Sequence, residues 1–298
     1  MPHALPADAR VAVLAWYDAR GRALSFRTTR DPWAILVSEV MAQQTQISRV
    51  VEAWSRFLVR FPTVMALAAA SPADVLRAWR GMGYDRRALN LHRTARVIVA
   101  EHDGQVPRDL AALQRLPGIG PYTARAVASI AFGMRVGAVD TNVRRVLGRA
   151  LGGGAGLAPP ALQAAADASV DPDRPADWTH SVMDIGAKVC RPARPRCDDC
   201  PLRPWCQFAR SPAATRPRPL STARDEVAPA SFKTTTRWLR GRIVDRLRDA
   251  DGASWIVVEA PIGDHAERAI DAALTALARD GIIELDPLVT RRARLSTA

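Results

Sequence analysis

The sequence contains almost no lysine. Of its 42 basic residues only Lys188 and Lys233 are lysines, and all the others are arginines. A genomic base-composition bias is the simplest explanation. The scarcity still restricts the chemistry, because a mechanism through a Schiff base needs a lysine amine and few positions can supply one.

Long apolar stretches and a secretory leader are missing as well. The apolar runs are short and interrupted by charge, so we expect no transmembrane helix and no membrane partner. The first residues, MPHALPADAR, lack the basic start and apolar stretch of a secretory signal. We therefore expect a cytoplasmic protein, and a reducing compartment disfavours disulfides among its four cysteines. We also expect a monomer.

The composition indicates a globular protein with a polyanionic partner. A chain of 298 residues corresponds to two domains or one large one. With 48% apolar and 24% charged residues it can bury a core. The formal charge of +12 favours nucleic acid as a partner, although a basic surface can also serve solubility alone.

Hydrophobic periodicity divides the chain into two regions of different character. From about residue 6 to 206 apolar residues recur at three- and four-residue spacing, as in WAILVSEVMAQQTQISRVVEAWSRFLVRF, which predicts helices throughout. Ser71 and Asp74 in SPAD predict a helix-capping box. Residues 207–228 are rich in Pro, Ala, Ser and Arg without periodicity and are interpreted as a linker.

Residues 229–298 have a mixed pattern. TTRWLRGRIVDRLRDA predicts an amphipathic helix, SWIVVEA a short strand, ERAIDAALTALARDGIIELD a helix running into a strand, and VTRRARLST a further strand. Helices followed by a small hairpin predict a winged-helix-like α/β module. Such a module can contact DNA or another protein, and the sequence does not separate the two.

The stretch LPGIGPYTA, residues 116–124, predicts a helix–hairpin–helix. Gly118 and Gly120 permit a tight hairpin, and Pro121 suits the first turn of the helix that follows. The exposed amides of such a turn, together with a helix N-terminus, can bind a DNA phosphate. A plain αα turn is the alternative; Thr123 after the turn and the basic chain favour DNA.

Two carboxylates occupy unlike surroundings. Glu39 lies within the apolar stretch WAILVSEVMA, where burial would favour a protonated general acid, unless it is a partly exposed helix-face residue. Asp140 precedes TNVRRVLGRAL and is interpreted as a helix N-cap, a position that also holds an aspartate ionised. One neutral acid and one fixed anion are what cleavage of a glycosidic bond through an oxocarbenium-like state requires.

All four cysteines fall within CRPARPRCDDCPLRPWC, residues 190–206, with the spacing C-x6-C-x2-C-x5-C. Four thiolates can hold a tetrahedral zinc, but zinc sites usually combine two close cysteine pairs. Only one close pair is present here, which favours an iron–sulfur cluster without excluding zinc.

The hairpin, the aspartate twenty residues past its second glycine and the cysteine run resemble the iron–sulfur branch of the helix–hairpin–helix DNA glycosylases. Within that branch, SEVMAQQTQ, GMGYDRRALNLH, LPGIGPYTARAVAS and VDTNVRRVLGR are similar to the MutY family, which removes adenine opposite 8-oxoguanine. The resemblance covers residues 22 to 206. It implies a mainly α, two-lobed glycosylase fold at 6–206, a [4Fe–4S] cluster in the loop 190–206, and double-stranded DNA with A·8-oxoG or A·G mispairs as partner in the bacterial nucleoid.

The resemblance also implies roles for individual residues. Glu39 would protonate the adenine and later handle the attacking water, and Asp140 would stabilise the sugar cation with Tyr122 and Asn142 close to it. The base pocket would be lined by Arg22, Leu24, Arg27 and His180. The DNA contacts would be Gln44 and Tyr84 inside the duplex, the hairpin residues Gly118, Gly120 and Thr123, and Arg191, Arg194 and Arg196 of the cluster loop. The cluster ligands would be Cys190, Cys197, Cys200 and Cys206.

The chain departs from this family in several places. Tyr122 stands where the endonuclease III relatives carry the lysine that attacks the sugar, so we expect a monofunctional glycosylase. Phe26 replaces a pocket tryptophan, and His180 stands where relatives have glutamate or glutamine, which puts base preference in question. Residues 229–298 are too short and too helical for the Nudix-like domain with which well-studied members read 8-oxoguanine.

Two rival functions remain open at this point. A thymine or uracil glycosylase for T·G or U·G mismatches would share Tyr122, Asp140 and the cluster, but Gln43-Gln44-Thr45 favours the adenine enzyme. A non-catalytic, cluster-containing DNA-binding regulator would explain the winged-helix-like tail, but it has no use for a buried acid at Glu39.

Overall fold

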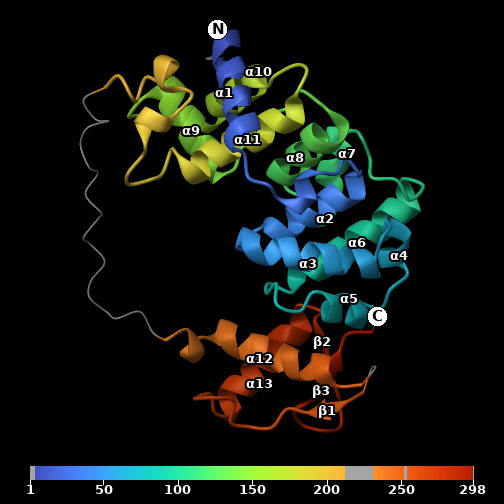
Figure 1. Ribbon diagram of the computed structural model, residues 1–298. Helices are drawn as coiled ribbons and strands as arrows, with labels where there is room; N and C mark the ends of the chain where they lie inside the picture. Colours follow the sequence, from blue (N-terminus) through green and yellow to red (C-terminus); the bar gives the residue numbers. More distant parts are fainter. Residues whose placement is uncertain (1–3, 212–230, 252–253, 298) are drawn as a thin grey trace. The chain divides into compact units, whose positions relative to one another are not determined.

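A computed structural model describes residues 4–211, 231–251 and 254–297, and these residues are mainly helical, as predicted (Figure 1). Most of the expected linker 207–228 lies outside the described residues. The chain divides into two compact units. Unit 1 holds the described residues within Met1–Glu39, Pro107–Arg115 and Ile119–Ala223, and unit 2 those within Val40–Val106, Leu116–Gly118 and Arg224–Ala298. No helix of the described residues is long and apolar enough to cross a membrane.

The helices of the N-terminal two thirds follow the predicted periodicity. In chain order they are α1 (Ala7–Arg20), α2 (Pro32–Ala42), α3 (Ile47–Arg60), α4 (Val64–Ala68), α5 (Pro72–Ala78), α6 (Arg86–Glu101), α7 (Leu110–Arg115), α8 (Pro121–Phe132), α9 (Thr141–Gly152), α10 (Pro159–Ser169) and α11 (Pro175–Lys188). The 3-10 turns η1 (Ser25–Arg27), η2 (Cys197–Asp199) and η3 (Arg203–Trp205) lie between or after them.

The stretch 33–61, which the periodicity treats as helical, contains a break. Residues 43–46 separate α2 from α3, and Gln44 there has a φ of 53°. Apolar spacing continues across the break, so periodicity alone does not reveal it. The predicted capping box is confirmed: the Ser71 hydroxyl accepts a hydrogen bond from the Asp74 amide at 3.1 Å and donates one to its carboxylate at 2.7 Å.

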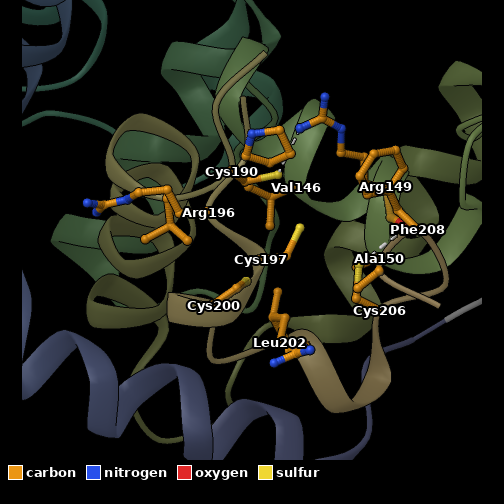
Figure 2. Close-up of a pocket in the computed structure, with 14 residues that line it drawn as sticks. Val146, Arg149, Ala150, Cys190, Arg196, Cys197, Cys200, Leu202, Cys206 and Phe208 are labelled. Atoms are coloured by element: carbon orange, nitrogen blue, oxygen red, sulfur yellow. Dashed lines mark hydrogen bonds between the residues drawn. The ribbon is translucent and has the colours of Figure 1, made fainter. Parts of the chain in front are cut away.

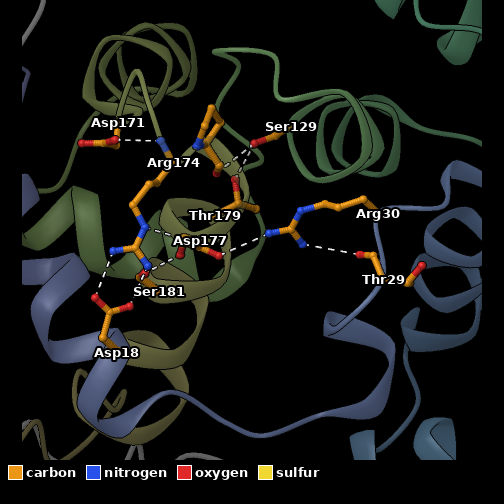
Figure 3. A network of polar contacts seen from close by, with 10 residues as sticks. Asp18, Thr29, Arg30, Ser129, Asp171, Arg174, Asp177, Thr179 and Ser181 are labelled. Carbon is orange, nitrogen blue, oxygen red and sulfur yellow. Dashed lines mark hydrogen bonds and ion pairs between the residues drawn. The ribbon is translucent and has the colours of Figure 1, made fainter.

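In unit 1, α11 packs against α1, α8 and α9 and is buried around most of its circumference. Its N-terminal end is fixed by polar contacts (Figure 3). Arg174 donates to the Asp18 carboxylate of α1 at 2.6 and 2.9 Å and to Asp177 at 2.9 Å. The hydroxyls of Ser129 on α8 and Thr179 on α11 bond at 2.8 Å. These contacts fix the position of the helix that carries the predicted pocket residue His180.

In unit 2, the C-terminal residues form a small module that contains η5 (Phe232–Thr234), α12 (Thr236–Asp249), β1 (Ile256–Val257), α13 (Glu267–Arg279), β2 (Ile283–Leu285) and β3 (Arg292–Leu295). The antiparallel sheet has the order β1-β3-β2, with Ile283 paired to Leu295. The expected helices and hairpin are present, although β1 is shorter than SWIVVEA suggests. The predicted fold class, mainly α with a small C-terminal sheet, is confirmed. The module packs on α5 through α12 and β3.

Candidate active site

Glu39 lies on α2 and is the last residue of this helix that belongs to unit 1. Its carboxyl group lies in an apolar environment. The preceding residues of the helix, from Trp33 to Ser38, are all buried. The Oε2 atom of Glu39 is buried and has no hydrogen-bond partner among the described residues. Burial raises the pKa of Glu39 to about 7, which outweighs the opposing effects of a hydrogen bond with Tyr122 and of the Arg27 charge. The carboxyl group can therefore hold and release a proton near neutral pH.

Asp140 caps the N-terminus of α9. Its Oδ1 accepts a hydrogen bond from the Val143 amide at 2.6 Å, and its Oδ2 accepts one from the Asn142 side chain at 3.0 Å. The predicted N-cap is confirmed. Amide donors directed at both oxygens fix the orientation of this carboxyl group, and its negative charge can stabilise a developing positive charge.

Tyr122, in the first turn of α8, interacts electrostatically with the carboxyl groups of both Glu39 and Asp140. Its hydroxyl lies 3.9 Å from the Met183 sulfur. Burial and the neighbouring carboxyl groups of Glu39 and Asp140 raise the pKa of Tyr122 well above its usual value. Tyr122 therefore remains a neutral donor. The structure brings Glu39, Tyr122 and Asp140 close enough to interact electrostatically, and the Asn142 side chain is hydrogen-bonded to Asp140.

Asp184 is a site residue that the sequence interpretation missed. It lies fully buried on α11 and binds both predicted pocket arginines. Arg22 donates to it from Nε at 2.6 Å and from the backbone amide at 2.8 Å. Arg27 forms a two-pronged pair with both carboxylate oxygens at 2.9 Å. The available signal was the one used for Glu39, an acid within a short apolar stretch, here VMDIGA.

The other pocket residues surround this ion pair. His180, on α11, is 5% exposed, and burial followed by the charge of Arg27 lowers its pKa to about 3. His180 is therefore a neutral imidazole, unlike a glutamate at the same position. Leu24 precedes η1 and is partly exposed, so it remains available to a ligand.

Gln44 and Tyr84, both in unit 2, have strained backbones. Their φ angles of 53° and 49° lie in the left-handed region, which costs non-glycine residues about 1–3 kcal/mol when held there. Such strain persists only where the surroundings enforce it and is frequent at functional sites. Tyr84 is 40% exposed, which suits a side chain that inserts into a ligand.

Arg87, at the start of α6, holds the strained residues Gln44 and Tyr84 in place. It is a second residue that the sequence analysis missed. Its Nη1 donates to the carbonyl oxygens of Val40, Met41 and Gln43 at 2.6–2.9 Å. Its Nη2 donates to the Thr45 hydroxyl at 3.0 Å and to the carbonyls of Met82 and Gly83 at 3.0 and 3.1 Å. One guanidinium thus ties the loop that contains Gln44 to the loop that contains Tyr84.

The predicted hairpin is present between α7 and α8. Gly118 has a φ of 75°, and a Cβ atom there would lie 2.8 Å from the Asn90 side chain, so the glycine is required. The Thr94 hydroxyl of α6 donates to the Pro117 carbonyl at 2.7 Å. Gly120 caps α8 and Pro121 begins it. Thr123 is 2% exposed, so any DNA contact at this position would come from its backbone.

The four cysteines line one pocket of about 380 Å³, which includes space open to solvent (Figure 2). All four thiols are free, and the rest of the lining is largely apolar, with Val146, Leu202 and Phe208. Burial raises the pKa of Cys200 to about 12. Within the described residues, no three His, Cys, Asp or Glu side chains converge closely enough to hold a single metal ion.

Two arginines of α9, the helix that Asp140 caps, bind the cysteine loop. Arg149 donates to the Cys190 sulfur at 3.4 Å and to the carbonyls of Arg191 and Pro192, both at 2.8 Å. Arg145 donates to the Cys190 carbonyl at 2.5 Å and to the Asn142 side chain at 2.8 Å. The three predicted DNA contacts of the loop, Arg191, Arg194 and Arg196, are all exposed, and Arg196 also pairs with Asp199 at 3.4 Å.

Comparison with known proteins agrees with this arrangement. Residues 37–166 match the HhH-GPD superfamily of base excision DNA repair proteins. The chain is 44% identical to an adenine DNA glycosylase of Mycolicibacterium smegmatis, over 92% of each chain. It is 42% identical to the adenine DNA glycosylase of Homo sapiens, over 66% of this chain and 39% of that protein. Among solved structures, a thermostable thymine-DNA glycosylase aligns with a TM-score of 0.64 at 29% identity, over 67% of this chain and 94% of that one.

The fold and these matches define a DNA N-glycosylase, a hydrolase of base excision repair. The chain belongs to the adenine DNA glycosylase family of the MutY type.

Proposed function

We propose that this protein removes adenine mispaired with 8-oxoguanine or guanine from double-stranded DNA, by hydrolysis of the N-glycosidic bond and without cutting the strand. The observation that carries the proposal is the buried carboxyl group of Glu39, with its pKa near 7, beside the amide-capped carboxylate of Asp140. The names of the most similar curated relatives support adenine as the base.

The proposed mechanism uses the difference between the two carboxyl groups. Protonated Glu39 donates its proton to the adenine ring, and the bond between C1′ and the base nitrogen breaks with its electron pair leaving on the base. Asp140 stabilises the positive charge that remains on the sugar. Glu39, now a carboxylate, accepts a proton from the attacking water as its oxygen bonds to C1′. The products are neutral adenine and an abasic site, and Glu39 is again protonated.

The base must leave the stack before this chemistry can occur. Extrusion costs a few kcal/mol of unstacking. We propose that Gln44 and Tyr84 enter the duplex beside the guanine or 8-oxoguanine and so offset this cost. Their strained loops, held by Arg87, support this role because a preorganised wedge loses little conformational entropy on binding.

The proposed site has a tyrosine where a lysine nucleophile for strand cleavage would be needed. Tyr122 occupies the position at which the endonuclease III relatives carry lysine. Lys188 donates instead to the Arg20 carbonyl at 2.6 Å, and its ammonium lies 5.9 Å from the Trp16 ring. We therefore propose that pure enzyme leaves an abasic site intact until heat or alkali is applied.

Cys190, Cys197, Cys200 and Cys206 fit a [4Fe–4S] cluster. A zinc ion needs four sulfurs at about 2.3 Å from one point. Among the described residues the four thiols line one pocket without converging on such a point, and a cluster, in which each thiolate binds a different iron, does not require them to. The cluster would contribute no step of the reaction; it would fix the loop that presents Arg191 and Arg194 to the DNA backbone.

The two rival functions are weaker but testable. A thymine or uracil glycosylase is supported by the structural alignment with a thymine-DNA glycosylase, although at lower identity than the adenine relatives. A non-catalytic regulator would have no reason to keep a buried acid with one unpartnered oxygen, which destabilises the fold near neutral pH.

One assay tests all three functions. The protein is incubated with duplexes containing A·8-oxoG, A·G, T·G or U·G and then treated with alkali. Cleavage at adenine supports the proposal, cleavage confined to thymine or uracil selects the mismatch enzyme, and no cleavage in any duplex selects the regulator. Omitting the alkali tests the monofunctional mechanism, which strand scission would contradict.

A further inference from the structure

The C-terminal module is fixed to the loop that carries Tyr84. The guanidinium of Arg248, on α12, is buried and donates to the Leu76 carbonyl at 2.9 Å and to the Asp85 carboxylate at 2.6 Å. Asp249 pairs with Arg80 at 2.5 Å. A buried arginine with matched acceptors tolerates little displacement, so α12 has a defined position beside residues 80–85 of the same unit.

This docking brings the beginning of α12 onto the Tyr84 side chain. The Arg237 guanidinium lies 4.1 Å from the centre of the Tyr84 ring, whereas that of Arg87 lies 5.6 Å from it. Arg237 is exposed, and among the described residues it has no carboxylate within ion-pair distance. Its charge is therefore free for a ligand that approaches Tyr84.

The charge around Arg237 suits an anionic ligand. The segment SFKTTTRWLR, residues 231–240, contains three cations and no acid. Arg240 pairs with Asp280 at 2.5 Å, which leaves Lys233 and Arg237 as the open charges. The surface charge of α13, the second helix of the module, is different because this helix exposes Glu267 and Asp271. These carboxylates would repel phosphates even though Arg291 lies 3.2 and 3.5 Å from them.

We propose that the start of α12 is part of the DNA-binding surface and that Arg237 contacts the strand carrying the guanine or 8-oxoguanine, beside Tyr84. The inference rests on the proposed function, specifically on Tyr84 entering the duplex. At 4.1 Å from the ring, Arg237 comes within reach of the same strand when Tyr84 inserts. A guanidinium suits either acceptor there, a phosphate oxygen or the edge of the guanine.

The mycobacterial comparison is consistent with a role for this segment. A match that covers 92% of the chain extends into the module, whereas the human match covers 66%. The module is thus shared with some adenine glycosylases rather than being an isolated addition to this chain.

The test compares two arginines of α12 on opposite faces. Arg246 is exposed and lies nine residues from Arg237, which at about 100° per residue places it about 180° around the helix. Arg237→Ala and Arg246→Ala are each made in a Glu39→Gln background, so that binding to an A·8-oxoG duplex can be measured without excision. We expect Arg237→Ala to raise Kd at least 5-fold and Arg246→Ala less than 2-fold. Equal effects would overturn the inference.

Two further measurements, on a double variant and on adenine excision by the unaltered protein, separate this inference from the proposed function. Adding Tyr84→Ala to Arg237→Ala should raise Kd by less than the product of the two single effects, because the two side chains act as one contact. A fully multiplicative effect would contradict the shared contact. If the unaltered protein excises adenine but Arg237→Ala binds normally, only this inference fails. If the unaltered protein does not excise adenine, the proposed function fails instead.

Discussion

The environment of Glu39 couples catalysis to stability. Burial raises the pKa of the carboxyl group from 4.5 to about 7, so the folded protein binds this proton more tightly than the unfolded chain does. The corresponding stability is complete below about pH 4.5 and is lost as the pH rises to about 7. A residue that destabilises the fold at its working pH is typical of an active site.

Glu39→Gln should therefore abolish excision and at the same time remove a pH dependence of folding. Between pH 5 and pH 8 the free energy of unfolding of the unaltered protein should fall by about 2 kcal/mol relative to that of the variant. Urea denaturation at both pH values measures this difference. Glu52→Gln, at an exposed position of α3, is the matched control and should behave like the unaltered protein. Parallel profiles for Glu39→Gln and the unaltered protein would show that the carboxyl group is not desolvated.

Asp184 governs the orientation of the pocket arginines. Asp184→Asn removes the charge that pairs with Arg22 and Arg27, and loss of one partner from a buried ion pair costs about 3–5 kcal/mol. Asp18→Asn, in the more exposed pair with Arg174, should cost about 1 kcal/mol or less. Thermal or urea unfolding distinguishes them, and similar small losses for both would show that the Asp184 pair does not act as a buried one.

At the scale of structural elements, the two loops after α2 and before α6 behave as a pair. Each contains a left-handed residue, Gln44 or Tyr84, and both are held by the guanidinium of Arg87. Burial lowers the pKa of Arg87 to about 10, so the side chain remains charged at neutral pH. Its charge strengthens hydrogen bonds that no neutral side chain could replace.

Arg87→Lys should loosen both loops, because an ammonium cannot reproduce the forked geometry of the guanidinium. We expect DNA affinity to fall about 10-fold or more, a loss of at least 1.4 kcal/mol. Arg86→Ala, at the neighbouring exposed position, should change affinity less than 2-fold. Fluorescence anisotropy with an A·8-oxoG duplex measures both, and normal binding by Arg87→Lys would remove the proposed positioning role.

We expect the order of the cysteine loop to depend on the proposed cluster. Cys200→Ser should abolish a visible absorption band near 400 nm, roughly where iron–sulfur clusters absorb, and weaken DNA binding. The dependence of Kd on salt should become shallower, since fewer phosphate contacts release fewer counterions. A colourless unaltered protein that contains zinc would contradict the cluster.

At the scale of the whole molecule, local signals predicted most of the fold. Apolar spacing identified the helices, and capping residues such as Ser71 and Asp140 marked where two of them begin. The break at Gln44 was not predictable in this way, because a tertiary contact with Arg87 enforces it. Arg87 itself was missed for the same reason: five of its acceptors are backbone carbonyls, which leave no trace in the pattern of side chains.

The site was predicted unevenly for a related reason. Residues that carry chemistry could be recognised by type and position, whereas Asp184 acts only through partners more than 150 residues away in the chain. The attachment of the C-terminal module was likewise not predictable, because it depends on single arginines among many. Arg248 and Arg237 differ from the other arginines of α12 only by what they contact.

The most direct test of the account is single-turnover excision of adenine from an A·8-oxoG duplex, measured against Glu39→Gln and its control Glu52→Gln. We predict excision by the unaltered protein and by Glu52→Gln, with a rate that falls as the pH rises above about 7, where Glu39 loses its proton. Glu39→Gln should bind the duplex and release no base. Excision by Glu39→Gln at the rate of the unaltered protein would contradict the assignment of the general acid.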